Sequence, residues 1–351
     1  MVKVEQLLCL DNESFIAEFI KLKDKVREVK YRSDNPDPLQ TKRLIHLGFS
    51  WGAKFYVVRD ESEQVIMRLA TRVLPHEPHL GVIGFFEMDT HHPHREMAFA
   101  TILETLTTDF KEKGVRQIAA PVDLSTWFNY RFALYDKRAW PRFKWEPTTP
   151  AAYEAIFRKH LFSDFAYYHS VFFPYFRLGN YYFGSGPLSK SYKNIFKRGF
   201  HLEPFNMQEI SRDLPTLHQI THEAFTGSFL FEPLDEQTFS TLYASALQGY
   251  DYSASAKLIA PDGEIAGFIF AFYDGDYLII KSLALRRKYQ GLNLSSGMIY
   301  HCCKHSFPRK IKGTISALVR NGIASEKIEK NVNKTLWFSW SHKYILLKKD
   351  I

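Results

Sequence analysis

Two segments of this 351-residue chain repeat the same order of expected elements: a strand, a helix and a second strand. In the first segment, an apolar run over 80–87 predicts a buried strand, a helical stripe over 95–113 predicts an amphipathic helix, and 115–119 predicts the next strand. Gly114 stands where a helix commonly ends. The residues expected on the buried face of the helix are Met97, Phe99, Ile102, Leu103, Leu106 and Phe110.

The second segment has the same order later in the chain. Residues 277–285 and 313–318 predict strands on either side of a helix over 294–305. A further strand over 267–272 precedes them, joined through an Asp-Gly pair that tolerates the positive φ of a tight hairpin. In both segments about 35 residues separate the starts of the two flanking strands, which indicates an internal duplication.

The length of the chain also favours two domains, because a single core usually stops growing before 351 residues. Residues 177–191 are rich in glycine and serine and contain a proline, which is typical of a linker. We therefore predict a boundary near residue 185 and domains at 1–185 and 186–351.

Composition narrows the class of protein. An apolar share of 45% excludes a disordered chain, and the dispersal of the basic residues behind the net charge of +8 makes a nucleic-acid partner unexpected. The most apolar stretch, 165–183, is broken by charged and polar residues, so neither a membrane span nor a membrane partner is expected. Charged residues interrupt the first 11 residues, where a signal peptide needs an apolar core. The three cysteines form no disulfide framework, which predicts a cytoplasmic protein.

The junction after residue 285 is the strongest candidate for a functional site. A basic, glycine-bearing turn leads from a strand into a helix, where backbone N–H groups lack intrahelical acceptors and the helix dipole favours an anion. An ordinary structural turn explains this pattern as well. The candidate binding residues are Leu283, Ala284, Leu285, Arg286, Arg287, Lys288, Gln290, Gly291, Leu292, Asn293, Leu294 and Ser295.

These residues resemble motif A of the GNAT superfamily of acetyl-CoA-dependent N-acyltransferases, Gln/Arg-x-x-Gly-x-Gly/Ala. Lys288 falls at the Gln/Arg position, Gly291 at the first glycine and Asn293 at the final Gly/Ala. Asn321 and Ser325 resemble the region where the family's next helix begins beside the pantetheine arm. The closing segment 336–349 looks like the family's terminal strand pair.

The resemblance extends over most of the chain, to a bacterial group of tandem GNAT-like proteins of unassigned substrate. Its landmarks are 84–87, 113–118 with 121–122, and 224–225 through 231–234. It implies an α+β fold of two GNAT-like domains in tandem, each a mixed, mainly antiparallel sheet flanked by helices. It also implies acetyl-CoA or another acyl-CoA as cosubstrate.

The turn that corresponds in the first half, 88–94, has no glycine. Asp89 would repel phosphate, and Pro93 removes one N–H donor. The first domain is therefore expected to be a degenerate copy, serving as a structural partner or as part of the acceptor-binding wall.

Other clusters allow two interpretations each. The five histidines within 76–94, and His301 with His305 beside Cys302 and Cys303, are residue types that bind metals. Surface exposure and core packing explain them better, so no metal is expected. The aromatic run 165–176 fits a slot for an apolar acceptor or, more simply, a strand pair that buries one face.

Catalytic groups are only weakly indicated. Direct transfer from a thioester to an amine needs no protein nucleophile, only an oxyanion donor, a base and an optional acid. Backbone N–H groups of Leu283–Leu285 would supply the oxyanion donor, Glu232 is a candidate base, and Ser325 is a candidate donor near sulfur. No tyrosine occurs between Asn321 and Thr335, where the family often has its acid.

The sequence thus predicts an acyl-CoA-dependent N-acyltransferase that acts on a small-molecule or peptide amine. Two alternatives stay open at this point. One is a binding or scaffold protein that has kept the fold without turnover. The other is aminoacyl transfer from charged tRNA, which also uses paired GNAT-like domains.

Overall fold

The computed structural model of the chain describes residues 2–28, 38–134, 142–174, 186–246, 249–322 and 340–351. The chain forms two compact units, and each has its own buried core. Unit 1 comprises Met1–Ala139, Lys144–Tyr168 and Lys343–Ile351, and unit 2 comprises Trp140–Phe143 and His169–His342.

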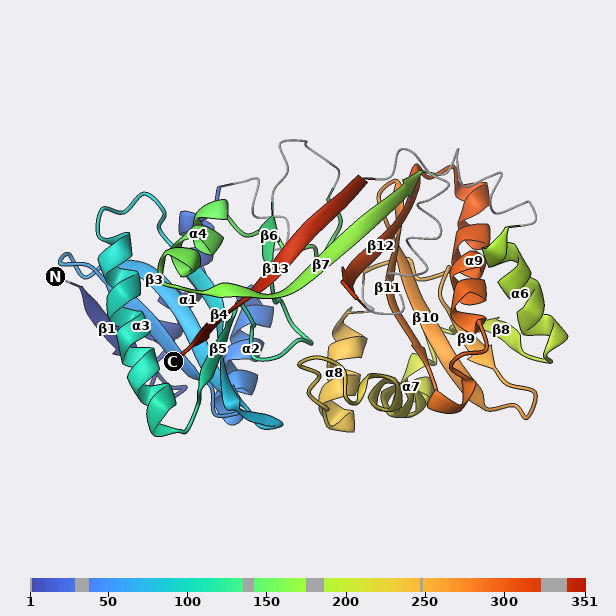
Figure 1. Cartoon of the computed structure of the whole chain (residues 1–351), viewed down its shortest axis with the longest axis horizontal. Coiled ribbons are helices and arrows are strands. Elements are labelled where there is room, and N and C mark those ends of the chain that lie inside the picture. The colour runs from blue at the N-terminus through green and yellow to red at the C-terminus, as the bar shows by residue number, and fades with distance from the viewer. Residues whose placement is uncertain (1, 29–37, 135–141, 175–185, 247–248, 323–339) are drawn as a thin grey trace. The chain divides into compact units, whose positions relative to one another are not determined.

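Unit 1 is a mixed sheet with helices on both faces (Figure 1). Its strands lie in the order β1-β2-β3-β4-β5-β13, antiparallel except for the parallel pair β4 and β5. Its elements are β1 (Lys3–Gln6), α1 (Glu13–Val26), α2 (Pro38–Ser50), β2 (Lys54–Arg59), β3 (Val65–Leu74), β4 (Glu77–Met88), α3 (Arg95–Glu112), β5 (Gln117–Ala120), β6 (Phe132–Leu134), α4 (Ala151–Lys159) and most of β13 (Trp340–Asp350).

Alternation along β2 explains why both faces of this sheet are covered. Successive side chains of a strand point to opposite faces. Tyr56 and Val58 belong to the same buried cluster as α3, whereas Phe55 and Val57 belong to the cluster formed with α1. Each face therefore buries its own apolar layer.

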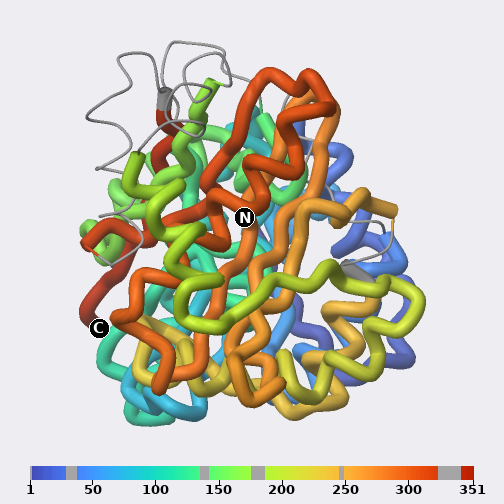
Figure 2. Tube along the Cα trace, turned by 90° about the vertical axis from the view of Figure 1, so that its right-hand side faces the viewer, coloured from blue at the N-terminus to red at the C-terminus, as the bar shows by residue number. Residues whose placement is uncertain are grey.

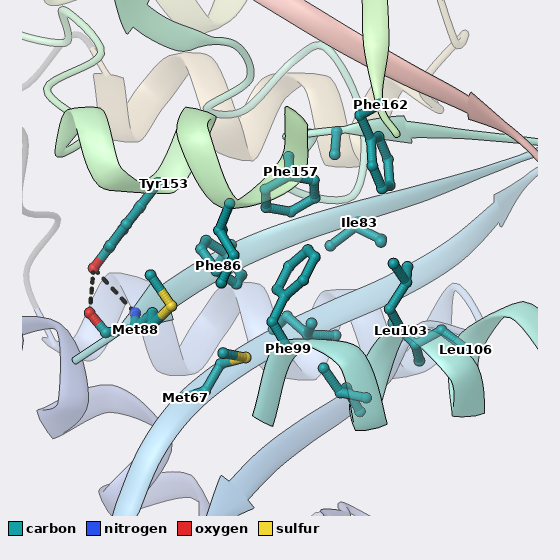
Figure 3. Packing of buried hydrophobic residues seen from close by; sticks show 14 of the residues in the cluster. Met67, Ile83, Phe86, Met88, Phe99, Leu103, Leu106, Tyr153, Phe157 and Phe162 are labelled. Carbon is teal, nitrogen blue, oxygen red and sulfur yellow. Dashed lines mark hydrogen bonds between the residues drawn. The ribbon is translucent and has the colours of Figure 1, made fainter. Parts of the chain in front are cut away.

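The layer beneath α3 is built from interlocking aromatic rings (Figure 3). The ring of Phe86 on β4 meets Phe99 of α3 at 5.7 Å, and it meets Tyr153 and Phe157 of α4 at 5.0 Å, in each case edge to face. Edge-to-face pairs of this kind add about 0.5–1.5 kcal/mol each beyond the area that they bury. These contacts fix α3 and α4 over β4.

The last strand of the chain completes the sheet of unit 1. β13 pairs antiparallel with β5, with Leu347 opposite Ala120, and with β6, with Tyr344 opposite Ala133. Ile345 and Leu347 are fully buried in the unit 1 core. The expected strand pair of the second domain is thus, in the described residues, one long strand that joins the first unit.

Unit 2 repeats the plan with strand order β12-β11-β10-β9-β8, in which only β11 and β12 are parallel. β10 and β11 form the expected hairpin, with Gly275 at φ 53 in the turn; both are orange in Figure 2. The elements are α6 (Pro187–Lys197), β8 (His201–Pro204), α7 (Ile210–Phe225), α8 (Glu236–Ala246), β9 (Ala256–Ile259), β10 (Ile265–Asp274), β11 (Tyr277–Leu285), the 3-10 turn η2 (Arg287–Tyr289), α9 (Leu294–Ser306), the 3-10 turn η3 (Phe307–Arg309) and β12 (Gly313–Arg320). β7 (Ser163–Pro174) begins in unit 1 and ends in unit 2.

The fold class and the two strand–helix–strand segments are confirmed, while three local expectations need correction. Met97 is 40% exposed rather than buried, because it lies on the solvent side of α3. Residues 187–191 start a helix instead of belonging to a linker, since Pro187 occupies the first helical turn, where its missing N–H costs nothing. The run 165–176 is a single strand as far as residue 174. The predicted boundary near 185 lies outside the described residues.

Within the described ranges, none of the helices combines the length and the apolar character needed to cross a bilayer.

Candidate functional site

β11 changes its pairing partway along its length. Its parallel ladder with β12 ends where Ile280 faces Ser316, whereas its antiparallel ladder with β10 continues to Leu285. A β-bulge at Lys281 separates the two regions. Among the described residues, the last four of β11 are therefore paired with a strand on one side only. Leu283, Ala284 and Leu285 lie in this half-open stretch.

β12 turns away from β11 beyond the end of their ladder. Leu318 has a φ of 59, a left-handed conformation that is rare for a branched side chain, and its N–H donates to Ser170 Oγ of β7 at 2.9 Å. The bulge on β11 and the distorted residue on β12 together make the two parallel strands diverge. A bulge beside a site commonly serves to redirect the backbone in this way.

The turn that follows β11 exposes backbone donors. Gly291 has a φ of 80 and no atom within 4 Å of the place where a Cβ would stand. Asn293 has a φ of 59, and its side chain does not cap α9, which starts at Leu294. Asparagine tolerates this left-handed conformation better than most other non-glycine residues, which explains how it can replace a glycine here. The N–H groups of Leu294 and Ser295 have no acceptor within the helix.

α6 holds this turn in place. Ser191 Oγ donates to the carbonyl of Asn293, and Asn194 Nδ2 donates to the carbonyl of Leu292 at 3.3 Å. Both donors come from the helix that was expected to be a linker. α6 therefore binds the carbonyl groups of residues 292 and 293, directly before the first N–H groups of α9.

One basic side chain of the turn and the backbone N–H of the next residue bind the same carboxylate. Arg286 Nη1 lies 3.2 Å from Glu223 Oε2, and the backbone N–H of Arg287 donates to Glu223 Oε1 at 2.6 Å. The Arg287 guanidinium donates to the carbonyls of Glu223 and Thr226. Glu223, on α7, therefore neutralises part of the positive charge that the sequence assigned to an anion.

The third basic residue has its own acidic partner. Lys288 Nζ lies 2.5 Å from Glu264 Oε1, and this bond raises the pKa of Lys288 and lowers that of Glu264. Tyr289 donates to the same carboxylate at 2.8 Å. Gln290 Nε2 donates to the carbonyl of Leu285 at 3.1 Å, which ties the turn back to the end of β11.

Asn321 and Glu232 are the other predicted site residues that the structure describes. Asn321 is exposed, and its Oδ1 lies 2.7 Å from His169 Nδ1. Ser325 lies outside the described residues. Glu232 is 7% exposed in the segment between α7 and α8. That segment reaches the end of β12, because the guanidinium of Arg320 lies 4.3 Å from the centre of the Phe229 ring.

Two neighbouring histidines of α7 hold the segment that carries Glu232. His218 Nε2 lies 2.8 Å from the carbonyl of Leu234, and the N–H of Leu234 donates to His222 Nε2 at 3.2 Å. The ring centres are 4.1 Å apart. Burial lowers the pKa of His222, which keeps its Nε2 available as an acceptor at neutral pH.

Tyr243 of α8 was missed by the sequence analysis. Its hydroxyl bonds to Ser282, within the half-open stretch of β11, and burial raises its pKa to about 12. Its ring stacks on Phe239 at 4.2 Å. The phenol is therefore a protonated donor beside the diverging strands. Its place in the sequence gives no signal, because the contact joins a helix to a strand that follows much later.

In unit 1, the segment after β5 covers the position on β4 that corresponds to the half-open stretch of β11. Val122 N–H donates to Ile83 O at 2.8 Å, and the Asp123 carboxylate accepts from the N–H of Phe85. A Cβ on Gly84 would lie only 2.1 Å from Val122 O, so the two backbones touch there. The turn after β4 also places an acceptor where a phosphate would need a donor, since Asp89 Oδ1 accepts the N–H of His91. Unit 1 does not offer the open edge that unit 2 has.

The histidine and cysteine clusters assemble no metal site in the part of the chain that the structure describes. His92 Nε2 instead lies 3.2 Å from Asp60. Cys302 and Cys303 are fully buried in the unit 2 core, as expected for small packing groups.

Comparison with solved structures identifies the fold. Along all of its length the chain is similar to a tandem GNAT protein from the clavulanic acid biosynthesis pathway, with 11% identity, a TM-score of 0.58 and 98% of that chain covered. A probable N-acyltransferase from Enterococcus faecalis V583 gives 7% identity and a TM-score of 0.58, with 100% of this chain and 73% of that chain covered. A GCN5-related N-acetyltransferase from Sphaerobacter thermophilus gives 9% identity and a TM-score of 0.51, with 99% and 95% covered.

Neither a protein-family model nor a curated protein matches the chain. At these identities the structural matches establish the fold, and the fold is that of tandem GNAT proteins.

Proposed function

We propose that this tandem GNAT-fold chain is an acyl-CoA-dependent N-acyltransferase whose coenzyme site lies in unit 2. One observation carries the proposal. β11 and β12 diverge after Ile280, and the half-open end of β11 leads into a glycine turn at the start of α9. An open strand edge next to unpaired helix N–H groups suits a ligand with an extended polar arm and a pyrophosphate.

The residues present fit such a ligand. The N–H groups of Gly291, Leu294 and Ser295 would face the pyrophosphate, and the missing side chain at Gly291 lets it approach the backbone. The edge of β11 from Lys281 to Leu285 would pair with the amides of the pantetheine arm. A backbone N–H in that stretch would accept the developing charge on the thioester oxygen.

The chemistry needs few further groups. The substrate amine attacks the thioester carbonyl, a C–N bond forms, the C–S bond breaks, and coenzyme A leaves as the thiol. Glu232 is the candidate base for the ammonium proton, and Tyr243 is the candidate donor to the leaving sulfur. The proposed roles of Ser325 and Asn321 in the site remain predictions from the sequence.

The proposals for the acceptor substrate and for the cellular compartment rest on chemistry outside the site. We propose a primary amine on a small molecule or peptide as acceptor, because direct transfer demands a nucleophilic nitrogen. We propose the cytoplasm as compartment, because the three cysteines are free thiols, which a reducing environment preserves.

Calorimetric titration of acetyl-CoA into the full chain tests the site. Gly291→Val should weaken binding at least tenfold, because it adds a side chain where the phosphates must approach. Gly114→Val is the matched control, since Gly114 has a similar φ of 76 and equally open surroundings in unit 1. Unchanged binding in the Gly291 variant, or equal losses in both, would refute the assignment.

A second candidate function rests on Glu223 and Glu264. These carboxylates neutralise much of the basic turn, which weakens its attraction for phosphates. A protein that binds a less highly charged ligand without turnover fits that balance. Failure to bind acetyl-CoA, together with no acetylation of any member of an amine panel, would favour this second function.

A further inference from the structure

A cavity of about 60 Å³ lies inside unit 1, away from every residue used in the proposed function. It is lined by the C-terminal half of α1, by β3 and β4, and by residues between 121 and 149. That volume holds about four water molecules, or one small organic ion.

The wall of this cavity is rich in buried charge. Lys23, Arg27, Arg68 and Arg131 line it, and each is at most 7% exposed. Burying a cation costs several kcal/mol unless an anion compensates for it. Glu87 and Asp123 are the two carboxylates in the described lining.

Glu87 already forms a close ion pair with one of these cations. Arg27 Nε and Nη2 each lie 2.8 Å from a Glu87 oxygen, a bidentate pair with both side chains at most 5% exposed. The Tyr153 hydroxyl lies 3.0 Å from Glu87 Oε2. Figure 3 shows the same hydroxyl bonded to the backbone of Met88. Little capacity is left on Glu87 for a second guanidinium.

The Asp123 carboxylate also accepts a hydrogen bond, from the N–H of Phe85. This bond belongs to the closed contact between β4 and the segment after β5. In the described part of the chain, no hydrogen bond joins Glu87 or Asp123 to Arg68.

Arg68 is the cation of the wall with an unused hydrogen-bond donor. It is 3% exposed on β3, its Nε has no hydrogen-bond partner, and its Nη2 stays 3.8 Å from Glu87 Oε1. Its other contacts are the carbonyls of Phe19 and Ile20 and the Phe19 ring, 4.6 Å away. A guanidinium that faces a cavity with an unused donor is suited to a planar, two-oxygen anion.

We propose that this cavity is a binding site for a small carboxylate, held by Arg68 and supported by the other buried cations. The apolar part of the wall, which includes Leu44 and Phe132, would surround a short hydrocarbon chain. The enclosed volume favours a carboxylate of two to four carbons over a phosphate ester. The site is independent of the coenzyme site proposed in unit 2.

Ligand-observed saturation-transfer NMR with sodium propionate tests the site on the full chain, at constant ionic strength. We expect saturable binding with a Kd on the order of 1 mM, the range for so few heavy atoms. Parallel titrations use sodium chloride, sodium phosphate and coenzyme A as competitors. None of them should displace propionate at equal concentration.

Two variants separate binding from folding. Arg68→Gln should weaken propionate binding at least tenfold, while Arg116→Gln, at an exposed arginine of the same unit, should leave it unchanged. If Arg68→Gln does not fold, Leu44→Phe blocks the cavity without touching a charge, and it should abolish binding. The proposal is wrong if wild type shows no saturable binding, if both variants bind as wild type does, or if phosphate or coenzyme A displaces propionate.

Discussion

Replacing Glu87 by glutamine tests how the buried charges of unit 1 hold together. Glu87 is 2% exposed and accepts two bonds of 2.8 Å from Arg27, with Arg68 3.8 Å away. Glutamine keeps the shape of the side chain and removes its charge. The close pair between Arg27 and Glu87 then loses its negative charge, and so does the longer contact of Glu87 with Arg68.

The expected loss of stability follows from that geometry. Breaking a buried pair by removing one partner costs about 3–5 kcal/mol, because the remaining charge is uncompensated. Glutamine still offers one acceptor oxygen, so we expect a value near the lower end, about 3 kcal/mol. For an m-value of about 3 kcal/mol/M, the urea midpoint of unit 1 falls by about 1 M.

Urea denaturation followed by tryptophan fluorescence and by circular dichroism measures the loss. Glu104→Gln on the exposed face of α3 is the control and should change stability by less than about 0.5 kcal/mol. Sodium propionate should restore part of the loss in the Glu87 variant, because it supplies the missing negative charge. A loss below about 1 kcal/mol would show that the Arg27–Glu87 pair does not carry the stability assigned to it.

Three further outcomes are expected. Burial lowers the pKa of His301 to about 4, so neutral His301 contributes stability above about pH 6.5, and this contribution is lost as the pH falls toward 4. In urea titrations, the free energy of unfolding should therefore fall by about 2.5 kcal/mol less between pH 7.5 and 4.5 in His301→Phe than in wild type. Identical pH profiles of the two proteins would contradict this. Asn293→Gly should tighten acetyl-CoA binding severalfold in calorimetry, because glycine accepts the φ of 59 without strain and leaves more room; weaker binding would mean that the Asn293 side chain contacts the ligand. Tyr243→Phe should lower kcat ten- to a hundredfold with an unchanged Kd for acetyl-CoA, and an unchanged kcat would remove Tyr243 as the acid.

The repeated strand–helix–strand order was predictable because it depends on local periodicity. The buried residues of α3 recur at helical spacing, and the strands before and after both helices are predominantly apolar. The partner of β13 was not predictable in the same way. A strand's pattern shows which of its faces is buried, but the edge that it joins is set by residues far away, here Gln117–Ala120.

The candidate turn was located correctly between a strand and a helix, while its charge balance was not foreseen. Glu223 and Glu264 reach the turn from α7 and from the residue before β10, and no spacing rule connects them to Arg286 or Lys288. The buried charges of unit 1 did leave a signal. Arg68 and Arg72 interrupt an otherwise apolar strand, and charged residues there are rare unless they are paired or functional.

Amide hydrogen exchange with and without acetyl-CoA tests the central claim most directly, because it locates the ligand along the whole chain in one experiment. The account predicts added protection in residues 281–296, along the open edge of β11 and the start of α9, and none in residues 85–97 of unit 1. Protection confined to 85–97, or no change in 281–296 at saturating acetyl-CoA, would contradict it.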